Sequence, residues 1–177
     1  ARVTSLVRGL IMLGVEQGDR IVLISENRPA WLISDIAIMT TGAISVPGYV
    51  TNTEDDFLHI IKDSGAKGVI VSTRKLAERL LPAARCASEL KFVISIEPLG
   101  TTPASHFNLY QMDEIQEKGR AGAENVVKLA NSWHADETAC IIYTSGTGGT
   151  PKGVMLSHKA ILHNCAGARD ALEELGL

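Results

Sequence analysis

Residues 144–153 hold the side chains with the clearest chemical potential, because their types and spacing suit the binding of an anion. The segment reads Thr-Ser-Gly-Thr-Gly-Gly-Thr-Pro-Lys-Gly, with four glycines, four hydroxyl groups and one lysine. Glycines let backbone N–H groups approach a ligand closely, hydroxyls donate hydrogen bonds, and a lysine adds a positive charge. No Asp or Glu occurs from residue 138 to 168, whereas Lys152 and Lys159 do. These features predict a phosphate-binding loop.

The loop does not match the two commonest phosphate-binding patterns. A Walker A loop ends in Gly-Lys-Ser/Thr, whereas Lys152 here follows Pro151. The dinucleotide fingerprint fails as well, because its third glycine is missing. Residues 154–156 are typical of a strand, and Ser157 is placed to cap a helix after it, so we expect the loop to join two strands. A glycine-rich turn without a ligand is the other interpretation, although hairpin loops usually need only two to five residues.

Buried strands alternate with amphipathic helices along the rest of the chain. Strands that are apolar on both faces and separated by helices indicate parallel pairing with helices on the sheet. We therefore predict a doubly wound α/β fold, with a mainly parallel sheet flanked by helices. The expected strands are 20–25, 43–47, 67–73, 91–96, 139–143 and 154–156, and the expected helices are 3–13, 29–42, 53–65, 74–89, 109–118, 123–130 and one from Ser157 onward.

Local signals place several helix ends. Thr53 and Asp56 form a capping-box pattern, and Asn27 is expected to cap the helix that starts with Pro29. Pro82 is expected to kink or divide its helix. Other notable side chains are assigned structural roles: Trp31 and Trp133 as packing anchors, Cys140 as core, Arg74, Lys75, Arg79 and Arg85 as a solvated helix face, His158 as a loop or cap contact, and Ile161, Cys165, Ala168, Leu172 and Leu175 as an apolar stripe.

Composition limits the possible classes of protein. Of the 177 residues, 45% are apolar and 21% are charged, which excludes a disordered chain. Lys and Arg number 17 against 20 Asp and Glu, and this net charge of −3 argues against a nucleic-acid partner. The number of cysteines, three, is odd, which fits free thiols in a reducing compartment. No secretory signal is visible at the start, so we expect a cytoplasmic protein.

Residues 143–154 closely resemble a known signature. Tyr-Thr-Ser-Gly-Thr-Gly-Gly-Thr-Pro-Lys-Gly-Val is similar to the phosphate loop of the adenylate-forming superfamily, which includes acyl-CoA synthetases, luciferases and peptide-synthetase adenylation domains. The one departure is Gly148, where that superfamily usually has threonine. Segments 13–20, 26–31, 42–47 and 63–67 resemble further landmarks of its N-terminal region. Segments 27–29 and 49–53 look most like the long-chain fatty acyl-CoA synthetases.

The resemblance implies an activity and a set of ligands. A carboxylate attacks ATP to give an acyl-adenylate and pyrophosphate, and coenzyme A then displaces AMP. The implied co-substrates are ATP with Mg²⁺, a carboxylic acid such as a long-chain fatty acid, and coenzyme A, and a peripheral membrane association of the full-length enzyme is left open. The residues implied to hold the ATP phosphates are Thr144, Ser145, Gly146, Thr147, Gly148, Gly149 and Lys152. No metal ligand or catalytic acid, base or nucleophile is assigned.

The ends of the sequence suggest a part of a longer enzyme. The chain starts at Ala1 within a helical pattern and ends soon after the loop. We therefore expect residues 1–177 to be part of the N-terminal domain of an adenylate-forming ligase that is inactive alone. The alternative is a non-catalytic α/β module that folds alone and binds a phosphate or nucleotide.

Overall fold

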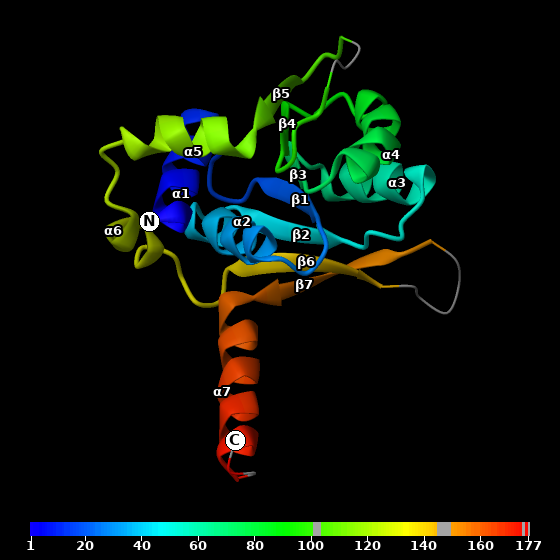
Figure 1. Ribbon diagram of the computed structural model, residues 1–177. Helices are drawn as coiled ribbons and strands as arrows, with labels where there is room; N and C mark the ends of the chain where they lie inside the picture. The colour runs from blue at the N-terminus through cyan, green and yellow to red at the C-terminus, as the bar shows by residue number, and fades with distance from the viewer. Residues whose placement is uncertain (101–103, 145–149, 175, 177) are drawn as a thin grey trace.

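A mainly parallel sheet forms the centre of the computed structural model, which describes residues 1–100, 104–144, 150–174 and 176. The sheet has seven strands in the order β5-β4-β3-β1-β2-β6-β7, and only the β6–β7 pair is antiparallel. The predicted doubly wound α/β fold is therefore confirmed (Figure 1). The strands are β1 (Arg20–Ile24), β2 (Ile44–Gly48), β3 (Gly68–Val71), β4 (Phe92–Ser95), β5 (Asn108–Gln111), β6 (Thr138–Thr144) and β7 (Lys152–Ser157).

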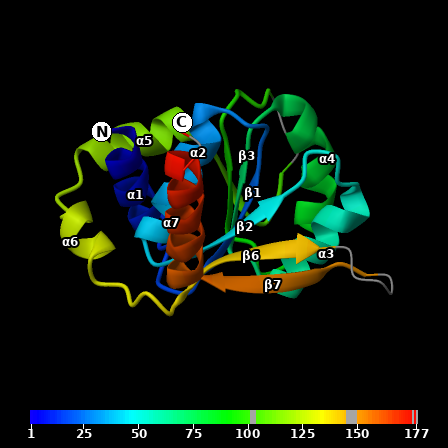
Figure 2. The ribbon, with the colours of Figure 1, turned by 90° about the horizontal axis from the view of Figure 1, so that it is seen from below.

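Helices cover both faces of this sheet. The helices are α1 (Arg2–Met12), α2 (Pro29–Thr40), α3 (Glu54–Ser64), α4 (Arg74–Arg85), α5 (Met112–Arg120), α6 (Val126–Ala130) and α7 (His158–Glu174). Figures 1 and 2 show α1, α2 and α5 on one side of the sheet and α3 and α4 on the other. Two separate cores result, because Ile21 and Leu23 of β1 pack towards the first group and Val22 and Ile24 towards the second.

Helix α3 is fixed at both ends. Thr53 accepts the backbone N–H of Asp56, and the Asp56 carboxylate accepts the Thr53 N–H at 2.8 Å, so the predicted capping box is confirmed. The hydrogen bonds that the Asp56 carboxylate accepts from the Thr53 N–H and then from the Thr53 hydroxyl lower the pKa of Asp56. At the other end Gly65 adopts φ +60°, and the Arg20 guanidinium donates to the carbonyls of Ser64 and Gly65. Helix α3 is therefore a well-anchored support for whatever it contacts.

Replacing Thr53 by alanine is expected to destabilise the fold by about 1 kcal/mol, because the helix loses its N-terminal side-chain acceptor. For a chain of this size that corresponds to a decrease of about 2–4 °C in the melting temperature. Thermal unfolding followed by circular dichroism measures the change. Thr53→Ser keeps the hydroxyl and should melt close to the wild type, and an equal loss in both variants would contradict a capping role.

Three expectations about local structure are wrong. Residues 108–111 form strand β5, where we expected a helix from 109, because Leu109 packs in one core and Tyr110 in the other. This alternation is typical of a strand. Arg28, and not Asn27, is the N-cap of α2, although Pro29 is its first residue as expected. Helix α4 runs through Pro82 and ends at Arg85, so it is not divided and stops before residue 89, while a kink at Pro82 stays a prediction.

Helices α1 and α5 approach each other through glycines. A Cβ atom on Gly119 would overlap the Ser5 carbonyl oxygen and lie 2.8 Å from the Gly9 nitrogen. A Cβ atom on Gly9 would lie 2.6 Å from the Ile115 carbonyl oxygen. The two backbones are therefore in direct contact at this crossing, which no larger residue permits.

Helix α7 extends away from the rest of the molecule, and none of its described residues is buried (Figures 1 and 2). Of its predicted apolar stripe, Ile161 is half-buried, Cys165, Ala168 and Leu172 are exposed, and Leu175 lies outside the described residues. The predicted Ser157 cap is confirmed, since Ser157 accepts the Ala160 N–H at 3.2 Å. None of the described helices has both the length and the apolar character needed to cross a membrane.

Candidate phosphate-binding site

The predicted loop is carried by the β6–β7 hairpin. The two strands pair in antiparallel register, with Tyr143 opposite Gly153 and Thr144 opposite Lys152. The expectation that the loop joins two strands is therefore confirmed. Because β6 runs parallel to β2, residue Thr144 leaves the sheet at its carboxyl edge, where β1, β2 and β3 also end. Ligands of open α/β sheets bind at this edge.

Two of the seven predicted site residues belong to the described part of the chain. Thr144 and Lys152 are both exposed, and they face each other as the last described pair of the hairpin. The others, Ser145, Gly146, Thr147, Gly148 and Gly149, lie outside the described residues, and their contacts with phosphate stay predictions. The hairpin thus brings a hydroxyl and an ammonium group to the same end of the site.

The charge of Lys152 is not neutralised by any described carboxylate. Lys159, the other lysine of the acid-free segment, differs because its ammonium lies 3.5 Å from the Asp136 carboxylate. Both lysines are on the surface, so this difference makes Lys152 the better candidate for an anion ligand.

Helix α3 contacts both arms of the hairpin, which the sequence did not predict. The Tyr143 hydroxyl donates to the Asp63 carboxylate at 2.6 Å, and His59 Nε2 lies 2.8 Å from the carbonyl oxygen of Pro151. The rings of His59 and Tyr143 also meet edge to face, with centroids 5.8 Å apart. Burial, followed by the Asp63 carboxylate, raises the pKa of Tyr143 well above its usual value, so its hydroxyl stays protonated and donates. We call these four residues the α3 brace.

Gly153 completes the packing around Tyr143. A Cβ atom at Gly153 would lie 2.7 Å from the Ile141 side chain and 3.2 Å from the Tyr143 ring. The absence of a side chain at this position therefore gives the Tyr143 ring its place over β7. Packing therefore explains why a glycine follows the lysine of the phosphate-loop motif in this fold.

A pocket of about 430 Å³ lies next to the hairpin, lined by Pro47, Tyr49, Asn52, Asp56, Ile60, Tyr143, Thr144 and Pro151. Its outer wall, the turn after β2, is tied to α4, because the Arg79 guanidinium donates to the carbonyls of Val50 and Asn52 at 3.0 and 3.1 Å. The predicted solvated face of α4 is therefore wrong at Arg79, which organises this wall. The prediction is also wrong at Arg85, whose Nε is buried.

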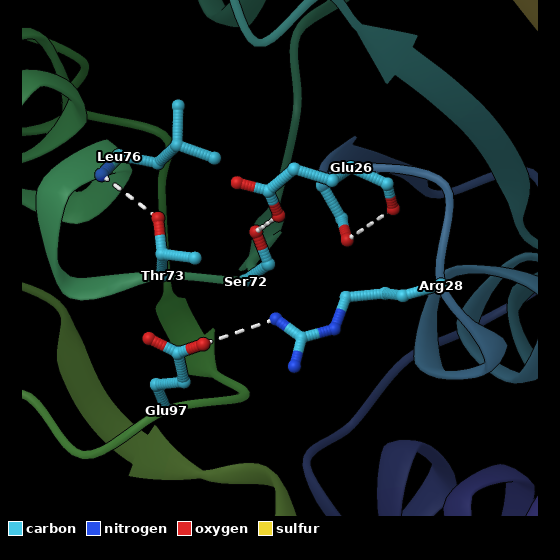
Figure 3. Close-up of polar contacts among 7 residues, drawn as sticks. Glu26, Arg28, Ser72, Thr73, Leu76 and Glu97 are labelled. Carbon is cyan, nitrogen blue, oxygen red and sulfur yellow. Dashed lines mark hydrogen bonds and ion pairs between the residues drawn. The ribbon is translucent and has the colours of Figure 1, made fainter.

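The point where the sheet order reverses, between β1 and β3, is occupied by the protein's own side chains (Figure 3). Ser72 donates to the Glu26 carboxylate at 2.6 Å, which lowers the pKa of Glu26. Arg28 forms an ion pair with Glu97 at 3.1 Å across the same edge. Doubly wound sheets often bind nucleotides at such a point. Here the candidate site lies instead beyond β2, at the end of β6.

Other chemically interesting residues have structural roles. Trp133 is a packing anchor as predicted, because its indole N–H donates to the Thr40 carbonyl at 2.9 Å and its ring covers Gly42. Cys140 is buried, as predicted, and burial together with the nearby Asp35 raises the pKa of its thiol, which argues against a nucleophile. In the described ranges, no three His, Cys, Asp or Glu side chains gather closely enough to hold a metal ion.

Comparison with known proteins gives the family. The profile of the family described as "AMP-binding enzyme" matches residues 1–176. The chain belongs to this family, and its fold is that of the N-terminal region of adenylation enzymes.

Individual relatives agree with this assignment. The chain is 34% identical over 163 residues to the long-chain-fatty-acid–CoA ligase FadD15 of Mycobacterium tuberculosis, an alignment that covers 91% of this chain and 26% of the relative. It is 31% identical over 174 residues to the long-chain-fatty-acid–[acyl-carrier-protein] ligase AEE15, chloroplastic, of Arabidopsis thaliana, with 91% and 24% covered. The chain thus spans about a quarter of the length of these relatives.

A solved structure supports the fold independently. The A-PCP didomain of carboxylic acid reductase from Segniliparus rugosus, in complex with AMP, matches with a TM-score of 0.78 and 21% identity. The match covers 89% of this chain and 24% of that chain. At this identity the likeness concerns the fold, and the function has to be argued from the site.

Proposed function

We propose that this chain forms the ATP phosphate-binding part of an acid–thiol ligase that activates a carboxylic acid, in particular a long-chain fatty acid. The observation that carries the proposal is the β6–β7 hairpin, which presents Thr144 and Lys152 together at the carboxyl edge of the sheet. Membership in the AMP-binding family supports the same proposal, and so do the relatives that are named as fatty acid ligases.

The proposed reaction has two steps. In the first, a carboxylate oxygen forms a bond to the α-phosphorus of ATP, and the bond to the β-phosphate oxygen breaks to release pyrophosphate. In the second, the thiol sulfur of coenzyme A attacks the acyl carbonyl, loses its proton, and AMP leaves. We propose coenzyme A as the acyl acceptor. One relative is instead named for an acyl-carrier protein as its acceptor.

The contribution of this chain is to hold charge in the first step. Lys152 would neutralise negative charge on the β- and γ-phosphates, and the Thr144 hydroxyl would donate to a phosphate oxygen. Mg²⁺ would arrive with ATP and be held largely by phosphate oxygens and water. No cluster among the described residues suits a metal ion, and we assign no metal ligand among them.

The proposal is tested by exchange of labelled pyrophosphate into ATP by the intact protein that carries this chain. We expect exchange that requires Mg²⁺ and a carboxylic acid, with palmitate more effective than benzoate. Exchange favouring benzoate would overturn the fatty-acid assignment alone. If the protein binds ATP but catalyses no exchange with any carboxylic acid, the assignment as a ligase is overturned. A non-catalytic nucleotide-binding module is then favoured.

A further inference from the structure

The α3 brace joins the two arms of the hairpin directly behind the site. On the β6 arm Asp63 holds Tyr143, the residue before Thr144. On the β7 arm His59 holds Pro151, the residue before Lys152. Both contacts come from α3, and they meet the chain next to Thr144 and next to Lys152, so the brace acts on the base of the loop from outside.

The bond to Pro151 restrains the chain where it enters Lys152. The pyrrolidine ring fixes φ of Pro151, and the peptide unit that follows is planar. Holding the Pro151 carbonyl oxygen therefore restrains ψ, the one remaining free angle before Lys152. Because a carbonyl only accepts, His59 Nε2 must carry the proton of this bond.

The His59 side chain is kept in place by two direct contacts, with the Pro151 carbonyl and with the Tyr143 ring. His59 is half-buried on α3, whose ends are fixed by the capping box and by Arg20. The ring of Tyr143 stands against the imidazole edge to face, and Tyr143 is itself held by Asp63. His59 and Asp63 are four residues apart, so they lie on the same face of α3. The imidazole thus has little freedom to turn away from the hairpin.

We infer that His59 is a positioning residue for ATP binding, which directs Lys152 towards the phosphates through its hydrogen bond to the Pro151 carbonyl. This inference rests on the proposed function, because it takes the hairpin as the phosphate-binding loop. It adds a residue from α3, about 90 positions away in sequence, to a site that the loop motif defines alone.

The test separates the two half-reactions of the intact ligase. The first is measured as the KM for ATP in palmitate-dependent pyrophosphate exchange. The second is measured as thioester formation from supplied palmitoyl-adenylate and coenzyme A, which requires no triphosphate. His59→Leu should raise the KM for ATP about three- to tenfold, the loss expected for one hydrogen bond. It should leave the second half-reaction within about twofold, whereas general damage to the fold would lower both.

A conservative variant checks the role of the N–H donor. Gln carries an amide N–H near the position of Nε2, so His59→Gln should recover most of the affinity for ATP. If His59→Leu does not fold, His59→Asn carries the same test, because the shorter amide side chain stays polar but does not reach the Pro151 carbonyl as Nε2 does. A selective increase in the KM for ATP supports the inference, and equal loss in both half-reactions, or no change in either, overturns it.

Lys152→Ala distinguishes failure of this inference from failure of the proposed function. If Lys152→Ala raises the KM for ATP and His59→Leu does not, only the positioning role is wrong. If neither variant changes that KM while exchange persists, the hairpin is not the phosphate-binding loop, and both proposals fail.

Discussion

Replacing Lys152 by alanine is expected to weaken the binding of ATP·Mg²⁺ to the intact protein that carries this chain about tenfold to hundredfold. The variant removes one charge-assisted hydrogen bond to phosphate, which contributes roughly 1.5–3 kcal/mol. The structure adds to this expectation because no described carboxylate neutralises the Lys152 ammonium in advance. Calorimetric titration with ATP·Mg²⁺, without a carboxylic acid present, measures the change. Lys152→Arg should recover only part of the affinity, since a planar guanidinium replaces a point charge.

Lys159 supplies the matched control. It lies seven positions further along the chain, is exposed, and forms a surface ion pair with Asp136. Exposed pairs of this kind contribute little, so Lys159→Ala should change the affinity for ATP by less than about 0.5 kcal/mol. Small and equal losses in the two alanine variants would show that the hairpin has no special role in binding phosphate.

Replacing Gly119 by alanine is expected to destabilise the protein by about 3 kcal/mol, the upper end of the usual cost of overpacking. Glycine to alanine inside a helix normally stabilises it. Here the added methyl group would overlap the Ser5 carbonyl oxygen on α1 and crowd the Gly9 nitrogen, and neither backbone atom can turn aside. The melting temperature should fall by about 6–12 °C.

Gly167 provides the opposite case. It is in α7, and a Cβ atom there would meet nothing within 4 Å. Gly167→Ala should therefore stabilise α7 by about 0.5–1 kcal/mol through helix propensity alone. Thermal unfolding of both variants, followed by far-ultraviolet circular dichroism, shows whether each melting temperature falls or rises. A Gly119→Ala protein that melts at or above the wild-type temperature would contradict direct contact of the α1 and α5 backbones.

The sequence predicted most strands because they are continuous apolar runs bounded by turn residues. It missed β5, whose four residues begin and end with the polar side chains of Asn108 and Gln111 and lead directly into α5. An edge strand of this kind leaves little trace in a hydrophobic pattern. The order of the strands was also beyond reach, because the crossover rule fixes the hand of a connection and not which strands become neighbours.

The candidate site, like the fold, could be predicted from the sequence only in part. Local composition was enough to predict the hairpin and to single out Lys152. The brace from His59 and Asp63 could not be predicted, because its hydrogen bonds join residues 80 and 92 positions apart. The i, i+4 spacing of His59 and Asp63 was the only available signal, and it gives a shared face without a partner. Arg79 was misjudged for a related reason, since its acceptors are backbone carbonyls of another element. The cytoplasmic location and the membrane association stay predictions.

The two edges of the sheet differ in a way that affects how the isolated chain behaves at high concentration. At one edge β5 is four residues long and carries polar ends, which discourages further pairing. At the other edge β7 is six residues long, with Val154 47% and Met155 69% exposed. Such a strand offers a free row of N–H and C=O groups to a second molecule and is a template for aggregation. Met155→Lys, which places a charge in the middle of this strand, is therefore the first change to make when the 177-residue chain has to be kept in solution.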